Sequence, residues 1–137
     1  MRNWRPFALL VVVTVAALWL GMHLREVRLK RERTDAYQRV LRSYTEVLSL
    51  GATRKQVEDE LRARGASYER VSGFDATKAY ADLVKIGTER APWYCNKNNT
   101  YIKFAFDAAN PRLDRTSQSD SDILRSIAVT PWLQECL

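Results

Sequence analysis

Hydrophobic residues follow two patterns in this chain: one unbroken run near the start, and short periodic groups after it. The run covers residues 6–24, carries no Asp, Glu, Lys or Arg, and is interrupted in its interior only by Thr14. As a helix, its 19 residues would span roughly 28 Å, close to the hydrocarbon thickness of a bilayer. The run therefore predicts an N-terminal transmembrane anchor over residues 1–24, with the lipid bilayer as its partner.

A cleaved signal peptide would have an apolar core of about 7–15 residues and then a small-x-small cleavage site. Here the core is longer, and residues 18–23 contain no Ala-x-Ala sequence. Trp4 and Trp19 lie near opposite ends of the run, as aromatic residues at the two membrane interfaces do. We therefore expect a single-pass signal anchor that is not removed. The side chains expected in the bilayer are Phe7, Leu10, Val13, Leu18 and Trp19.

Helical signals continue after the apolar run. Residues 25–36 contain opposite charges at four-residue spacing, which predicts an exposed, charged helical stem. Apolar residues then recur at three- and four-residue intervals, which predicts a core-facing helix to about Leu50, with a short coiled coil as the alternative. The residues of this stripe are Tyr37, Val40, Leu41, Tyr44, Val47 and Leu48.

A second helix is expected directly after the first. Gly51 suits the left-handed conformation that ends a helix, and Thr53 with Gln56 forms a capping box that begins a new one. The new helix would cover residues 54–64 and end at Gly65. Two helices joined by so few residues predict a helical hairpin.

Strand-like alternation replaces the helical spacing after Gly65. The sequence Lys97-Asn98-Asn99 is expected to be a hairpin turn, and residues 107–120 a polar loop. The expected strands are 67–71, 82–89, 93–96, 100–106 and 123–130. In the fourth of them Ile102, Phe104 and Phe106 share one face, and in the last Ile123, Ile127 and Val129 share one face. The predicted fold class is α+β: an N-terminal transmembrane helix, then a helical hairpin packed on an antiparallel sheet of three to five strands, in a domain at 37–137.

The net charge of +6 belongs to the membrane flanks. Seven of the 22 basic residues and two of the 16 acidic residues lie before residue 34, so that 15 and 14 remain for the rest of the chain. A nucleic-acid-binding domain would need a basic face on its folded part, so we expect no nucleic-acid partner. Basic residues beside the anchor instead suit anionic lipid headgroups. They are Arg2, Arg5, Arg25, Arg28, Lys30, Arg31 and Arg33.

Cys95 and Cys136 are the two cysteines of the chain. An even count in a short, exported domain favours a disulfide, which on the chain-entropy model would stabilise by about 4 kcal/mol; two buried thiols in a cytoplasmic domain are the alternative. The positive-inside rule favours the cytoplasm, because five basic residues follow the anchor and two precede it. The cysteine pair favours the other side, and we expect the domain on the extracytoplasmic, periplasmic side.

No motif for catalysis or for a cofactor is present. The serines have no histidine partner, and no glycine-rich phosphate loop is found. Asp114, Asp120 and Asp122 lack the glycine and glutamate of a calcium loop and are expected to be solvated. We therefore expect no enzyme, no cofactor, no metal and no small-molecule substrate. Four aromatic residues near the cysteines form a candidate protein-binding patch: Trp93, Tyr94, Tyr101 and Trp132.

The segment from Gly51 to Leu61 resembles a motif of the SmpA/OmlA, or BamE-like, family of small outer-membrane lipoproteins. The matching residues are Gly51, Thr53, Arg54, Val57 and Leu61, and Ala52 replaces the usual methionine. The resemblance implies two helices packed on a three-stranded antiparallel sheet and a non-enzymatic role as a binding partner in outer-membrane barrel assembly. This chain departs from the family in having one strand more and no cysteine near the anchor, which excludes a lipoprotein signal.

The sequence thus predicts a membrane-anchored, non-catalytic domain of the cell envelope that binds an unidentified protein. A structural subunit of a membrane complex, held mainly through its transmembrane helix, is the alternative.

Overall fold

The computed structural model describes residues 5–72, 80–109 and 118–137, with side chains from residue 10 onward. Arg2, Trp4 and Asp114 lie outside the described residues, as do the side chains of Arg5 and Phe7. The chain divides into two compact units, Met1–Ala36 and Tyr37–Leu137.

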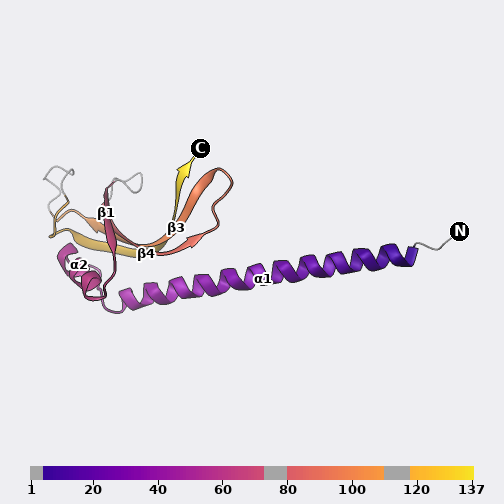
Figure 1. Ribbon diagram of the computed structural model, residues 1–137. Coiled ribbons are helices and arrows are strands. Elements are labelled where there is room, and N and C mark those ends of the chain that lie inside the picture. The colour runs from indigo at the N-terminus through magenta and orange to yellow at the C-terminus, as the bar shows by residue number, and fades with distance from the viewer. Residues whose placement is uncertain (1–4, 73–79, 110–117) are drawn as a thin grey trace. The chain divides into compact units, whose positions relative to one another are not determined.

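Helix α1 covers Arg5–Thr45 and is continuous through the apolar run and the stem (Figure 1). It is long and apolar enough to cross a membrane by its length and composition, which agrees with the predicted N-terminal membrane helix. Instead of an anchor helix followed by a separate hairpin, the described residues contain two helices in all, and the first runs from Arg5 through the whole apolar run.

Four strands follow the second helix, α2 (Arg54–Ala63). They are β1 (Tyr68–Ser72), β2 (Tyr80–Glu89), β3 (Cys95–Asp107) and β4 (Ile123–Cys136). They form one sheet in the order β1-β2-β3-β4, and each neighbouring pair is antiparallel. The predicted α+β class and the antiparallel sheet are therefore confirmed, with four strands.

Helix α1 ends at Thr45, five residues earlier than predicted. The reason is that the residues connecting α1 to α2 make a core contact and a backbone hydrogen bond to the sheet. Leu48 is buried in the core, and the Gly51 N–H donates to the Leu124 carbonyl at 2.9 Å, which an extended connection allows and a helix does not. Gly51 has φ +92° and turns the chain at this point. Val47, expected in the core, is exposed for the same reason.

Helix α2 begins as the sequence predicts. Thr53 is its N-cap, and both halves of the capping box with Gln56 are present. Val57 and Leu61 are completely buried, and Gly65 (φ +67°) follows the end of the helix.

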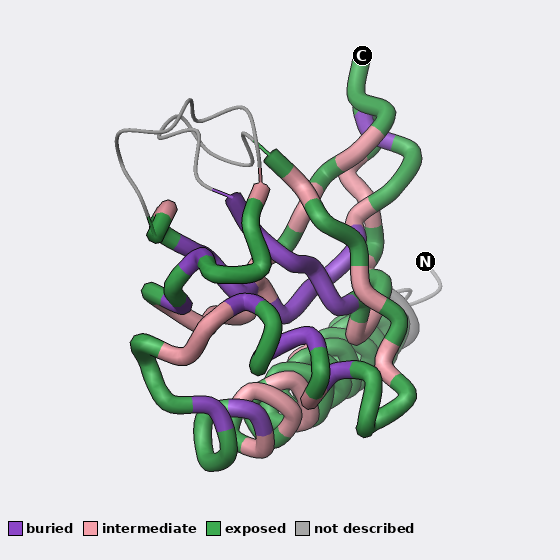
Figure 2. The backbone as a smooth tube through the Cα atoms, turned by 90° about the vertical axis from the view of Figure 1, so that its left-hand side faces the viewer, coloured by how far each residue is buried: buried purple, intermediate pink, exposed green. Residues whose placement is uncertain are grey.

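The main core lies between the helices and one face of the sheet, and Figure 2 shows the buried parts of the strands in purple. Ile102, Phe104 and Phe106 lie on this face as predicted, and Tyr44 packs edge-on against Phe104 with ring centroids 5.2 Å apart. In β4 the prediction was wrong at Ile123, which is exposed, whereas Leu124 is buried. A register shift opposite Ala105 and Phe106 changes the alternation there.

The predicted turn at Lys97–Asn99 is also wrong, because these residues lie inside β3. The Asn99 side chain donates to Gln134 at 3.1 Å and accepts from Thr88 at 3.0 Å, and Asn98 donates to the Arg90 carbonyl at 3.3 Å. Asparagine therefore serves here as a cross-strand partner, and the connection between β2 and β3 consists of residues 90–94. Likewise β4 does not stop at Thr130 but continues to Cys136.

Candidate functional site

A network of buried charges joins α2 to the sheet. Arg54, the first residue of α2, is 0% exposed. Its guanidinium donates to Asp82 of β2 at 2.6 Å and to Asp122 at 3.4 Å, and its charged carbon lies 4.7 Å from the centre of the Phe106 ring. Thr53 caps the helix, and the Arg54 N–H donates to the Asp122 carbonyl at 2.7 Å, which holds this first turn against the residues that precede β4.

Glu58 is the second centre of this network, and it is buried, with 1% of its surface exposed. Arg70 of β1 donates to both of its oxygens, at 2.7 and 2.9 Å. Arg62 and the Tyr68 hydroxyl also donate to it, at 2.9 and 2.8 Å. Arg70 also donates a hydrogen bond to Asp120 at 3.0 Å. Every carboxylate of the network thus has a cationic partner.

The pKa values of the two central acids shift in opposite directions. Burial tends to raise the pKa of Glu58, but the hydrogen bonds from Arg70 and Tyr68 outweigh it, and the pKa lies below its usual value. Burial raises the pKa of Asp82, and the bonds from Arg54 offset this only in part. Because each acid is occupied by arginine, the network suits a structural role better than proton transfer.

The prediction that Asp120 and Asp122 are solvated loop residues was wrong for Asp122. Asp122 is buried, pairs with Arg54, and accepts from the Ser119 N–H at 3.1 Å. Asp120 is exposed. Among the residues that the structure describes, no three His, Cys, Asp or Glu side chains are grouped so that they would hold a metal ion.

The opposite end of the domain carries exposed aromatic residues. Cys95 and Cys136 form a disulfide, as predicted, between the end residues of β3 and β4. Just before Cys95, Trp93 is 90% exposed and Tyr94 43% exposed, and their rings meet edge-on with centroids 5.7 Å apart. We call Trp93, Tyr94 and the disulfide the aromatic tip.

Backbone and charged contacts hold the aromatic tip together. The Leu137 N–H donates to the Tyr94 carbonyl at 2.8 Å, and the Cys95 N–H donates to the Pro92 carbonyl at 3.0 Å. Lys97 of β3 and Glu135 of β4 form an ion pair nearby. The tip is therefore built on a short, cross-linked ribbon.

The other two residues of the expected patch lie elsewhere. Tyr101 is buried and Trp132 half-buried, and they pack on each other and on Ala81 and Leu83, on the sheet face away from α2. The structure thus brings Trp93 and Tyr94 together and separates them from Tyr101 and Trp132.

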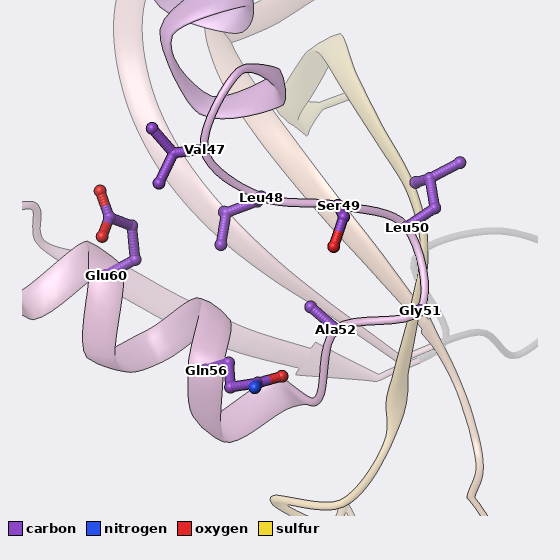
Figure 3. Close-up of a pocket in the computed structure, with 8 residues that line it drawn as sticks. All are labelled: Val47, Leu48, Ser49, Leu50, Gly51, Ala52, Gln56 and Glu60. Atoms are coloured by element: carbon purple, nitrogen blue, oxygen red, sulfur yellow. The ribbon is translucent and has the colours of Figure 1, made fainter.

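A shallow hollow lies beside the connection between α1 and α2 (Figure 3). Its volume is about 460 Å³. It is lined by Val47, Leu48, Ser49, Leu50, Gly51, Ala52, Gln56 and Glu60. Val47 and Leu50 are exposed, while Glu60 is paired with Arg64 at 2.5 Å. The hollow therefore combines exposed apolar side chains with polar groups, and the Glu60 carboxylate in its lining already has a cationic partner.

The described membrane and flanking residues lie along α1. Leu10, Val13, Leu18 and Trp19 are exposed, as side chains that face lipid would be. The basic residues Arg25, Arg28, Lys30, Arg31 and Arg33 are exposed on the same helix.

Sequence reasoning missed the charged network. A signal was present, because Asp82 is a single acid inside the apolar sequence Tyr80-Ala-Asp-Leu-Val84. Such an acid in a strand calls for a buried cationic partner.

Comparison with protein-family models, characterised proteins and solved structures gives no match to this chain.

Proposed function

We propose that this chain is a membrane-anchored, non-catalytic protein of the cell envelope that binds another protein through its aromatic tip. The observation that carries the proposal is the exposure of Trp93, 90%, beside the exposed Tyr94. Tryptophan and tyrosine dominate the binding energy of many protein interfaces, because they bury a large area at a small cost in side-chain entropy. The disulfide fixes the ribbon that presents them.

The disulfide also supports a location of the domain outside the cytoplasm, on the periplasmic side in a bacterial envelope. Disulfides persist in oxidising compartments and are rare in the cytosol. The five basic residues after the anchor favour the opposite orientation, and this proposal gives more weight to the cross-link. Labelling the cysteines in intact cells, with and without reductant, tests the location. Free thiols that react only after lysis would contradict it.

We further propose that the domain is BamE-like, with Tyr37–Thr45 of α1 and α2 acting as its helical hairpin. What supports this is the role of the matching residues: Gly51 turns the chain, Thr53 caps α2, and Arg54 is buried. These are roles in folding, so the resemblance supports an architecture more than a particular partner. A non-catalytic role is supported by the pairing of each buried acid with arginine.

Site-specific cross-linking in native membranes tests the function. A photoreactive residue at position 93 should give a defined cross-linked partner, whereas one at Lys55, an exposed residue of α2, should not. Capture of that partner by the full chain should be lost in Trp93→Ala/Tyr94→Ala and retained in Lys55→Ala.

The structural-subunit alternative makes the opposite prediction. Replacing residues 6–24 by an unrelated transmembrane helix should leave capture intact if the aromatic tip binds the partner. Loss of capture on this replacement, together with no effect of Trp93→Ala/Tyr94→Ala, would show that the membrane helix holds the complex.

A further inference from the structure

Strand β4 forms one edge of the sheet and is only partly covered. It is 14 residues long, and β3 pairs with one side of it. On its other side, the connection before α2 lies along its first residues: the Gly51 N–H donates to the Leu124 carbonyl at 2.9 Å, and the Leu124 N–H donates to the Ala52 carbonyl at 2.8 Å. Thr53 and Ile123 form an antiparallel bridge. This edge therefore already pairs with one extended segment.

The cover ends at Gly51, where φ of +92° turns the chain away. Within residues 5–72, 80–109 and 118–137, no backbone group outside the sheet bonds to β4 beyond Leu124. Leu50, at the point where the chain leaves the edge, is 67% exposed. An apolar side chain is thus exposed where the open edge begins.

Pro131 indicates which residues face the open side. Residues in an antiparallel pair alternate between bonding their partner strand and facing away from it. Proline has no N–H to donate, so its nitrogen in an edge strand faces outward. Alternation from Pro131 places the N–H and C=O groups of Ile127 and Val129 on the open side. The register shift opposite Ala105 and Phe106 gives Leu124 the same direction, in agreement with its bonds to the connection.

The open part of the edge lacks the charges that commonly protect such strands. From Ser126 to Gln134 the strand carries no charged residue. At the other edge of the sheet, β1 has five residues and includes Glu69 and Arg70. Pro131 limits pairing at its own position, but Ser126–Thr130 contains neither a charged residue nor a proline.

We infer that the outer edge of β4 at Ser126–Thr130 binds an uncharged, extended segment of a partner protein by strand addition, antiparallel to β4. The segment would continue the line of residues 51–53 and exchange backbone hydrogen bonds with Ile127 and Val129. The inference rests on the proposed function to the extent that the chain binds a protein, but it assigns a surface separate from the aromatic tip.

A second copy of the chain fits this edge poorly. A two-fold axis at Val129 would bring Gln134 of the second copy opposite Leu124, where the connection already lies. An axis at Pro131 avoids this clash but places two residues without an N–H opposite each other. It also requires Glu135, which has φ 54°, to pair as part of a regular strand. The geometry therefore favours a segment of different sequence.

The first test measures the open edge directly. Hydrogen exchange of the full chain in detergent should show fast exchange at the amides of Ile127 and Val129, and slow exchange at those of Ser126 and Ala128. Slow exchange at all four amides in the monomeric chain would overturn the inference, because the edge would then be covered.

The second test uses linear peptides selected from a display library on the full chain in lipid nanodiscs. Selected peptides should protect the amides of Ile127 and Val129 and should bind at least tenfold more weakly to Val129→Pro than to Val129→Ala. The alanine variant is the matched control, since both changes remove packing of Val129 on the core and only proline removes the N–H.

A further variant tests the open edge without removing a buried side chain. Ala128→Glu adds a charge beside the open edge at a partly exposed position opposite Lys103, and thermal unfolding checks that the domain remains folded. This variant should weaken the same peptides tenfold, whereas Trp93→Ala should not affect them. Failure to select peptides, equal binding to Val129→Pro and Val129→Ala, or self-association of the chain with protection of these amides would each overturn the inference. Loss of peptide binding on Trp93→Ala would assign it to the aromatic tip instead.

Discussion

The two ends of the domain distribute polar and apolar groups in opposite ways. At the α2 end, Arg54, Glu58 and Asp82 are buried among hydrophobic side chains. At the other end, where the β3–β4 ribbon reaches the C-terminus (Figure 1), Trp93 and Tyr94 are exposed. Each end reverses the usual preference of its residues.

The two ends differ in whether these unusual side chains find their partners inside the domain. At the α2 end every buried charge has a partner inside the domain, so the cost of burial is offset locally. At the aromatic tip, Trp93 keeps its apolar surface in water, and only a partner would remove it. We therefore expect changes at the α2 end to affect stability and changes at the aromatic tip to affect binding.

The largest loss of stability is expected from Arg54→Met. This change leaves Asp82 and Asp122 buried without their cation, and breaking a buried pair costs about 3–5 kcal/mol. Because two acids lose a partner, we expect about 5 kcal/mol in denaturant unfolding of the full chain in detergent.

The matched variant Arg54→Met/Asp82→Leu should recover part of this loss, since it removes one of the two unpaired charges. A loss below about 1 kcal/mol for Arg54→Met would contradict the structural role that we assign to the network.

A smaller loss is expected on removing the cross-link at the other end. Cys95→Ser/Cys136→Ser, or reduction of the native chain, should cost about 4 kcal/mol, because the unfolded chain regains the freedom of a long loop. Thermal unfolding with and without reductant measures this loss. The serine variant should not respond to reductant, and a response would mean that the effect does not come from this disulfide.

Next in size is the effect of Glu58→Gln, which should depend on pH. The pKa of Glu58 in the folded chain lies below the usual value of about 4.5, so the folded chain binds this proton less tightly than the unfolded chain does. Its contribution is therefore present above about pH 4.5 and is lost as the pH falls through the folded value. The pKa of Asp82 shifts the other way, mainly through burial, and Glu58→Gln removes only the smaller part of that rise that comes from the Glu58 charge.

We expect Glu58→Gln to cost about 2 kcal/mol at pH 7, as for the loss of hydrogen bonds to a charged group, and progressively less as the pH falls below about 4.5. Unfolding curves of both proteins from pH 7 down into the acid range measure the difference. A cost that does not decrease with falling pH would show that the carboxylate charge is not what matters.

The features of the fold that the sequence predicts correctly are those set by residues close together in the chain. The capping box of Thr53 and Gln56 and the alternation of Ile102, Phe104 and Phe106 depend on neighbours in the chain, and the structure agrees with both. The predicted turn at Lys97–Asn99 failed because Asn99 bonds to Thr88 and Gln134, which are far away in sequence. The early end of α1 has the same origin, in the pairing of Gly51 with Leu124.

The candidate site was predictable to a similar degree. The disulfide followed from the count of cysteines. The four aromatic residues were grouped by their closeness to those cysteines, but the alternation of β3 and its pairing with β4 separate Tyr101 and Trp132 from Trp93. Arg54 was noted as a residue of the family motif, but its burial and its ion pair were missed because its partner Asp82 lies 28 positions away.

The smallest effect on stability is expected at the most exposed aromatic residue. Trp93→Ala should change the free energy of unfolding by less than about 0.5 kcal/mol, since the side chain is already in water in the folded chain. Trp132→Ala, by contrast, removes packing on Tyr101 and should cost about 2 kcal/mol. Both variants lose the same side chain from the same ribbon, so denaturant unfolding of the two compares burial directly. If Trp93→Ala were as costly as Trp132→Ala, Trp93 would be part of the domain's own packing, and the aromatic tip would have no surface left to offer a partner.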